Sequence, residues 1–275
     1  EMKVCKYLIG IFTISALMVI VRIGEANCVI SIWWSRFIQF CFFLCPALLA
    51  WIIERRNLKD FCNDYLLSYQ NVNWQKMFRW VFYTAISYSL LVILFISIGG
   101  NLLGIDAIGR VVGVSKEFTY MGINFNGNSL FGITSLLIAN VIVSLCYGVT
   151  LGALTYIGEE IGWRGFLERH LTYNPVVKSI LVGLIWTLWG LPFYKNGIDN
   201  LFTLLAFNIV FSFYLSEAVG QSRSVWTAAA IRGVVSVCWL SVIEPAKSDV
   251  VQLGTVLCIV AVMLVVSRLV MRKNI

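Results

Sequence analysis

The chain has 275 residues, of which 59% are hydrophobic and 13% are charged, and its formal net charge is +7. A soluble globular domain carries about a quarter charged residues, so this composition excludes an ordinary soluble protein and predicts an integral membrane protein. Because Lys and Arg collect on the cytoplasmic loops of membrane proteins, the positive charge does not indicate a nucleic-acid partner. The expected surroundings are membrane lipids.

Eight apolar segments approach the length of about 20 residues that a helix needs to cross a bilayer. They are residues 4–21, 29–53, 80–98, 130–157, 176–193, 201–219, 225–242 and 250–266. The pattern predicts an all-α polytopic membrane protein of about eight transmembrane helices. We interpret it as a single membrane domain, 1–275, in which 1–129 holds the N-terminal transmembrane helices. The connection 99–128 is punctuated by Gly and Asn and is expected to be an irregular outer segment.

The positive charges orient these segments in the membrane. If both termini are cytoplasmic, 14 of the 21 Lys and Arg residues fall on inner loops and five on outer loops, with two inside spans. The positive-inside rule therefore predicts an N-in, C-in topology with an even number of spans.

Two adjacent acids, Glu159 and Glu160, follow the almost entirely apolar residues 128–157. Ionisable groups near hydrocarbon are costly, so these acids are expected to face a polar cavity and to be functional. Arg164 follows Glu160 by four residues, in the favourable order of acid before base. The two acids point about 100° apart on a helix, so they can line two walls of one cavity. The alternative is a charge cluster at a helix end that contains an ordinary ion pair.

Three further features interrupt the apolar segments after the acid pair. The sequence Trp186-Thr-Leu-Trp-Gly-Leu-Pro192 ends the fifth segment, where Pro192 favours a break. Asn208 and Glu217 lie in the sixth segment, and we interpret them as helix-packing polar groups or end groups. Arg232 lies in the middle of the seventh segment, where a guanidinium needs a polar partner.

The run Glu-Glu-Ile-Gly-Trp-Arg resembles the E-E-x-x-x-R motif of the CAAX protease and bacteriocin-processing (CPBP, or Abi) family. This family includes the prenyl endopeptidases that remove the last three residues of prenylated proteins. A second family motif, aromatic-x-x-x-His followed by Leu-Pro, is similar to the run that ends at Pro192, except that Gly190 replaces the histidine. Arg232-Gly-Val-Val-Ser236 takes the place of the third motif, His-x-x-x-Asn. The resemblance covers about 130–240, the CPBP/Abi-like core.

The resemblance implies an eight-span intramembrane endopeptidase whose catalytic residues are Glu159, Glu160 and Arg164. In the family, the first glutamate is thought to activate a water molecule that attacks the scissile carbonyl. The histidines are thought to position that water or a metal, and to stabilise the developing oxyanion. Such roles need an imidazole that can donate, accept or ligate.

The departures from the family motifs fall on the imidazole groups. Gly190 has no side chain, Arg232 cannot accept a proton or bind zinc, and Ser236 is a weaker substitute for an amide. The single histidine of the chain, His170, lies among charged residues and is interpreted as an interfacial surface residue. No cofactor is expected, and without the family histidines we expect no zinc or other metal.

These features lead to three hypotheses. The first is an intramembrane endopeptidase of the CAAX type, which uses a glutamate-activated water at a degraded site. The alternative is a non-catalytic membrane regulatory or bacteriocin-immunity protein, and a transporter component is a third hypothesis because acids in a membrane cavity also serve ion paths. The expected partner is a membrane-associated peptide or a prenylated protein, and the expected location is the bacterial plasma membrane.

The family motifs predict that Glu159, Glu160, Gly190, Arg232 and Ser236 converge on one cavity that faces the cytoplasm. Arg232 then occupies the space of the missing imidazole groups and forms an ion pair with the two acids, because a guanidinium fork suits a carboxylate. The alternative is that Arg232 reaches an interface or meets backbone carbonyls.

Overall fold

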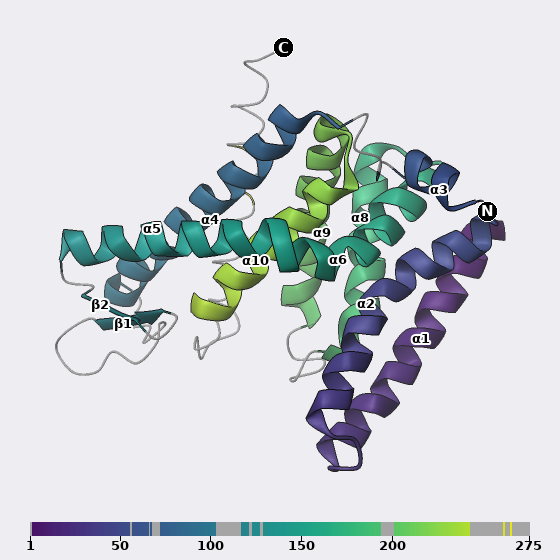
Figure 1. The fold of residues 1–275 in the computed structure, drawn as a ribbon, viewed down its shortest axis with the longest axis horizontal. Coiled ribbons are helices and arrows are strands. Elements are labelled where there is room, and N and C mark those ends of the chain that lie inside the picture. Colours follow the sequence, from purple (N-terminus) through teal and green to yellow (C-terminus); the bar gives the residue numbers. More distant parts are fainter. Residues whose placement is uncertain are drawn as a thin grey trace. The chain divides into compact units, whose positions relative to one another are not determined.

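The computed structural model describes residues 2–55, 57–65, 67, 72–102, 117–120, 123–126, 129–193 and 201–242, together with Ala261 and Val265. Helices dominate the described chain (Figure 1). They are α1 (Met2–Ala26), α2 (Ile32–Glu54), α3 (Leu58–Asp64), α4 (Trp74–Leu102), α5 (Leu130–Tyr147), α6 (Ala153–Glu160), α7 (Glu168–His170), α8 (Pro175–Gly190), α9 (Leu201–Ser222) and α10 (Val225–Val242). Two strands, β1 (Glu117–Tyr120) and β2 (Ile123–Asn126), lie between α4 and α5.

The prediction of an all-α, polytopic integral membrane protein is confirmed. Among the described residues, four helical stretches are long and apolar enough to cross a membrane: Met2–Ala26, Trp33–Glu54, Leu130–His170 and Leu204–Ser222. Pro175–Gly190 and Val225–Val237 are shorter apolar helices. The number of eight spans and the N-in, C-in topology stay predictions, and the last predicted span, 250–266, lies outside the described residues except for two positions.

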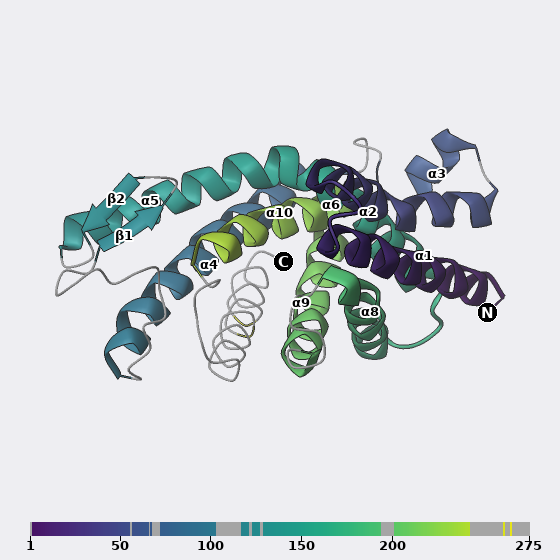
Figure 2. The ribbon, with the colours of Figure 1, turned by 90° about the horizontal axis from the view of Figure 1, so that it is seen from below.

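The segment 99–128 differs from the expected irregular connection. Helix α4 continues to Leu102, and β1 pairs with β2 in an antiparallel hairpin that sets Glu117 opposite Asn126. Strand β2 packs against α5 (Figure 2). Aromatic and β-branched residues are frequent in both strands, and these residue types favour a pleated, half-buried surface. The Gly and Asn punctuation obscured that pattern.

Side-chain caps fix where several helices begin. Asn174 accepts a hydrogen bond from the Val177 amide at 2.9 Å at the start of α8, and Pro175 occupies the first helical turn, where its missing N–H is tolerated. Ser129 caps α5 by accepting from the Gly132 amide at 3.0 Å.

The chain separates into two compact units. The first unit comprises Glu1–Met77 and Leu154–Ala229, and the second comprises Phe78–Ala153 and Ala230–Ile275. The interpretation of the chain as a single membrane domain stays a prediction.

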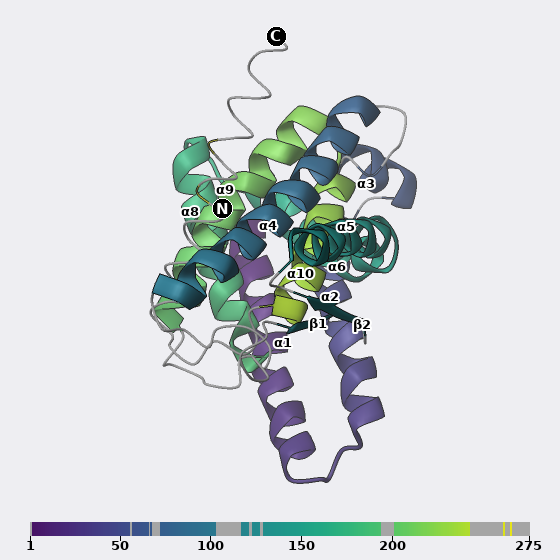
Figure 3. The ribbon, with the colours of Figure 1, turned by 90° about the vertical axis from the view of Figure 1, so that its left-hand side faces the viewer.

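In the first unit, α1 and α2 form an antiparallel helical hairpin (Figure 3), and α8 lies beside α9 (Figure 2). Helices α8 and α9 approach closely because Gly183 has no side chain. A Cβ atom there would lie only 2.6 Å from the Ile209 Cα. Asn208 on α9 donates to the Thr187 hydroxyl on α8 at 3.0 Å, and both side chains are buried. The interpretation of Asn208 as a helix-packing polar group is therefore confirmed.

In the second unit, glycines bring two helical backbones into contact. A Cβ atom at Gly152 would lie 2.6 Å from the Gly233 Cα on α10, and one at Gly148 would lie 2.4 Å from the Val234 side chain. Small residues allow this close approach in membrane proteins. A buried interhelical hydrogen bond from Asn140 on α5 to Ser89 on α4, at 2.8 Å, adds a polar contact.

Candidate active site

The acid pair lies on a helical stretch, Leu130–His170, that runs without interruption through α5, α6 and α7. The stretch is π-helical at Gly148–Gly152 and again at Ile161–Leu167. Glu159 and Glu160 end α6, and Arg164 lies inside the second π-helical segment. Such segments, with their i→i+5 hydrogen bonds, are frequent at functional sites.

All three charged motif residues are buried. The exposed fraction is 0% for Glu159 and Glu160 and 5% for Arg164. Charged side chains are almost never fully buried unless they are paired. Their partners therefore define what the site can do.

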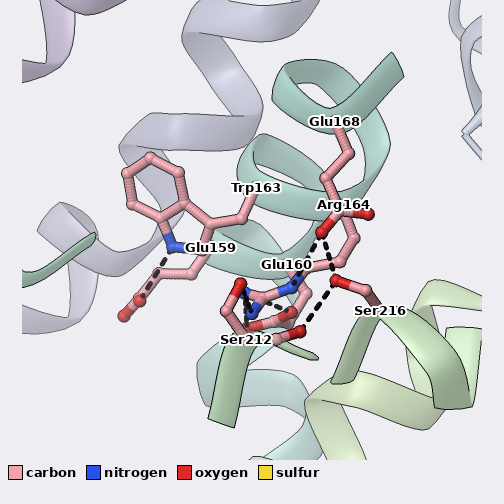
Figure 4. Close-up of polar contacts among 7 residues, drawn as sticks. All are labelled: Glu159, Glu160, Trp163, Arg164, Glu168, Ser212 and Ser216. Atoms are coloured by element: carbon pink, nitrogen blue, oxygen red, sulfur yellow. Dashed lines mark hydrogen bonds and ion pairs between the residues drawn. The ribbon is translucent and has the colours of Figure 1, made fainter. Parts of the chain in front are cut away.

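Glu160 pairs with Arg164. The Arg164 Nη1 atom lies 3.0 Å from Glu160 Oε2 and donates to Oε1 at 3.2 Å, while Nη2 donates to the Ser212 hydroxyl on α9 at 3.3 Å (Figure 4). The guanidinium also lies over the Trp186 ring, 5.2 Å from its centroid. The expected ion pair between Glu160 and Arg164 is confirmed, and α8 and α9 hold its cation in place.

A second acid joins this network from the other side of Arg164. Arg164 Nε lies 3.9 Å from Glu168 Oε1. Ser216 on α9 donates to the Glu168 carboxylate, and its hydroxyl also lies 2.7 Å from the Ser212 carbonyl (Figure 4). The sequence analysis missed Glu168 and both serines. Glu168 follows Arg164 by four residues, a spacing that could have indicated it, whereas the serines are brought there by the packing of α9.

Glu159 points to different surroundings (Figure 4). Its carboxylate accepts a long hydrogen bond, 3.4 Å, from the Trp163 indole Nε1. The Trp163 ring makes edge contacts with Tyr7 of α1, at 6.3 Å between ring centroids, and with Trp189 of α8, at 5.5 Å. Phe42 of α2 stacks on Trp189 at 4.2 Å. The two adjacent acids therefore face an aromatic side and an ionic side of one helix, and their lining of one cavity stays a prediction.

The end of α8 adjoins the aromatic side. Gly190, which replaces the histidine of the family's second motif, is buried and directly follows Trp189. The Trp189 carbonyl accepts a hydrogen bond from Ser15 of α1 at 2.9 Å. The first unit thus brings Glu159, Glu160 and Arg164 together with the end of α8.

Arg232 and Ser236 lie on the part of α10 that belongs to the second unit. Arg232 is 9% exposed, and Ser236 donates to the Gly233 carbonyl at 2.9 Å. Convergence of these two residues with the acid pair stays a prediction. The ion pair described for Glu160 is the one with Arg164.

His170, which the sequence suggests is an interfacial surface residue, is partly exposed and has partners on another helix. Its side chain is 23% exposed, and its Nε2 lies 3.0 Å from Glu54 Oε1 of α2. Its Nδ1 lies 2.8 Å from the Phe166 carbonyl, and its ring stacks on Phe166. Glu54 also pairs with Lys3 of α1 at 3.1 Å. Both ring nitrogens of His170 are therefore engaged with partners other than the acid pair.

Among the residues that the structure describes, no three or more His, Cys, Asp and Glu side chains are grouped to hold a metal ion. Among the described residues, the groups at this site that can act chemically are three carboxylates, a guanidinium, hydroxyls, and indole and phenol groups.

The site is thus a buried acid–arginine centre on a long helix of a largely helical chain. Residues 140–238 match the family model of the Type II CAAX prenyl endopeptidase Rce1-like proteins. This match confirms the resemblance to the CAAX protease family that the motifs predicted. No curated protein matches the chain.

Proposed function

We propose that this chain binds a membrane-associated peptide at the Glu159 side of the site and does not hydrolyse it at a useful rate. The observation that carries the proposal is what surrounds His170, the one histidine of the chain. Both ring nitrogens of His170 contact Glu54 and the Phe166 carbonyl, so no imidazole serves the acids.

The chemistry of the remaining groups supports this division between binding and catalysis. By resemblance, Glu159 is the acid that activates water, and Glu160 with Arg164 supports it. The developing oxyanion of a peptide hydrolysis needs donors aimed at it, and removal of one such donor lowers kcat by about 10²–10³. Both histidine positions of the family motifs have lost that group here, at Gly190 and Arg232.

The surroundings of Glu159 suggest the chemistry of the ligand. Aromatic rings from three helices cluster next to Trp163: Tyr7 of α1 and Trp189 of α8 contact its ring, and Phe42 of α2 stacks on Trp189. Apolar walls with a few polar groups are typical of ligand sites. A prenylated or otherwise membrane-embedded peptide matches this chemistry. The role that we propose for the protein is regulation of, or immunity toward, a membrane-active peptide in the bacterial plasma membrane.

Photo-crosslinking in lipid nanodiscs tests the binding. We expect a photoactivatable farnesylated peptide to label residues 156–163 or the end of α8, and mass spectrometry to recover the peptide backbone uncleaved. An excess of the same peptide without the photoactive group should remove this label. The lipid-facing Trp33, which is 82% exposed, serves as the control because labelling there should resist competition.

Two results would count against the proposal. Labels confined to exposed positions such as Trp33 would mean that the site does not bind this peptide class. Transfer of the intact peptide into the lumen of proteoliposomes would favour the transporter hypothesis instead.

A further inference from the structure

Two buried hydrogen-bond donors lie in the aromatic cluster around Trp163. Tyr7 is 0% exposed and Trp189 is 1% exposed. Within the described part of the chain, neither the Tyr7 Oη nor the Trp189 Nε1 has a hydrogen-bond partner. Buried polar groups are nearly always satisfied, because burial without a partner destabilises the folded state. These two donors therefore call for an acceptor.

The two donors share one neighbour, the Trp163 indole, which in turn donates to Glu159. The Tyr7 and Trp189 rings both make edge contacts with the Trp163 ring, and the Trp163 Nε1 lies 3.4 Å from the Glu159 carboxylate. The Tyr7 phenol also lies within electrostatic range of that carboxylate. Two donors and an acid thus gather around one indole ring.

A glycine makes room for the phenol. A Cβ atom at Gly162 would lie 2.3 Å from the Tyr7 Oη, so the hydroxyl rests where a side chain would otherwise stand. Gly162 is three residues after Glu159, a spacing that places the two positions on neighbouring parts of one helix face. The hydroxyl therefore lies against the same face of the helix as the acid.

We propose that Tyr7 and Trp189 bind one oxygen acceptor beside Glu159. The acceptor is a water molecule or the carbonyl oxygen of a bound peptide, and the peptide form rests on the function proposed above. Buried waters typically make about three hydrogen bonds, and the phenol, the indole N–H and the carboxylate supply three. The two donors come from α1 and α8, and they stand in for the imidazoles in binding an oxygen acceptor but not in proton transfer.

The replacement supports binding and not metal chemistry. An indole N–H only donates, and a neutral phenol is a poor base. Neither group offers the neutral imidazole nitrogen that ligates zinc or takes a proton from water. The site can thus hold and orient an oxygen acceptor without restoring the family's imidazole groups.

The sign of a stability change tests this site. Tyr7→Phe keeps the ring and removes only the hydroxyl. If the hydroxyl binds an acceptor, Tm falls by about 2–4 °C. If the hydroxyl has no acceptor, its removal leaves Tm unchanged or raises it, and the proposal is overturned. Trp189→Phe is the second variant, and the double variant should lose less than the sum of the two, because both donors share one acceptor.

A matched control and a second measurement separate the two forms of the acceptor. Tyr214→Phe removes the hydroxyl of another buried phenol of the first unit, on α9, which should not couple to Trp189→Phe. Adding the farnesylated peptide raises the Tm of the wild type. A smaller rise for Tyr7→Phe assigns the acceptor to the peptide carbonyl, and an equal rise assigns it to water. Additive losses from Tyr7→Phe and Trp189→Phe would contradict a shared acceptor, whether or not the peptide binds.

Discussion

Arg164→Met should lower the free energy of unfolding by about 3–5 kcal/mol, because removal of one partner of a buried ion pair leaves an uncompensated charge. Glu160 is fully buried, and its carboxylate lies 3.0 Å from the Arg164 guanidinium. Arg164 also lies near Glu168, so its removal leaves two acids close together without their shared cation. Thermal unfolding in detergent or nanodiscs, followed by circular dichroism, measures the loss.

A double variant identifies the cause of that loss. Glu160→Gln combined with Arg164→Met removes the uncompensated charge and should recover a large part of the stability. Arg169→Met is the control, because Arg169 is exposed and its described contact is with the Tyr65 ring. If the losses from Glu160→Gln and Arg164→Met simply add, the ion pair is not what stabilises this region.

Gly158→Ala should destabilise the first unit by at least about 1–3 kcal/mol, the usual cost of forcing an atom into a packed core. The added Cβ would lie 2.6 Å from the Phe43 carbonyl oxygen and 2.7 Å from the Leu44 Cα of α2. Both are backbone atoms, so α2 itself must move. Because Gly158 directly precedes the acid pair, this displacement should also disturb the labelling by the farnesylated peptide.

Gly220→Ala is the matched control for this prediction. Gly220 lies on α9, and a Cβ atom there would meet nothing within 4 Å. Ala is the better helix former by about 0.8–1.0 kcal/mol, so this substitution should leave Tm unchanged or raise it. A similar fall in Tm for both variants would show that helix flexibility, and not the contact with α2, explains the effect of Gly158→Ala.

Sequence reasoning identified those parts of the site that depend on local spacing. The adjacent acids and Arg164 occupy one helix, so their angular separation and their ion pair follow from the helical repeat alone. The apolar runs likewise predicted the helices, because hydropathy over a span is a property of consecutive residues. The family resemblance came from the same local motifs.

Contacts between segments far apart in the chain were not predictable in this way. Nothing in the sequence near Ser212 indicates that it will accept a hydrogen bond from Arg164, and the contact of Tyr7 with the helix face at Gly162 depends on how α1 packs. The contact of His170 with Glu54 was not predictable for the same reason, since Glu54 comes from α2. The strands β1 and β2 were missed because turn residues interrupt a short alternating pattern.

The most direct measurement is single-turnover cleavage of a membrane-embedded farnesylated peptide by the wild type and by Glu159→Gln. Glu159→Gln keeps the size of the side chain and removes its ability to act as a base. Because the acids have no imidazole to work with, both proteins should release product at the same background rate. A wild-type rate more than about tenfold above that of Glu159→Gln, equivalent to about 1.4 kcal/mol of transition-state stabilisation, would show that the carboxylates still catalyse hydrolysis and would contradict the proposed function.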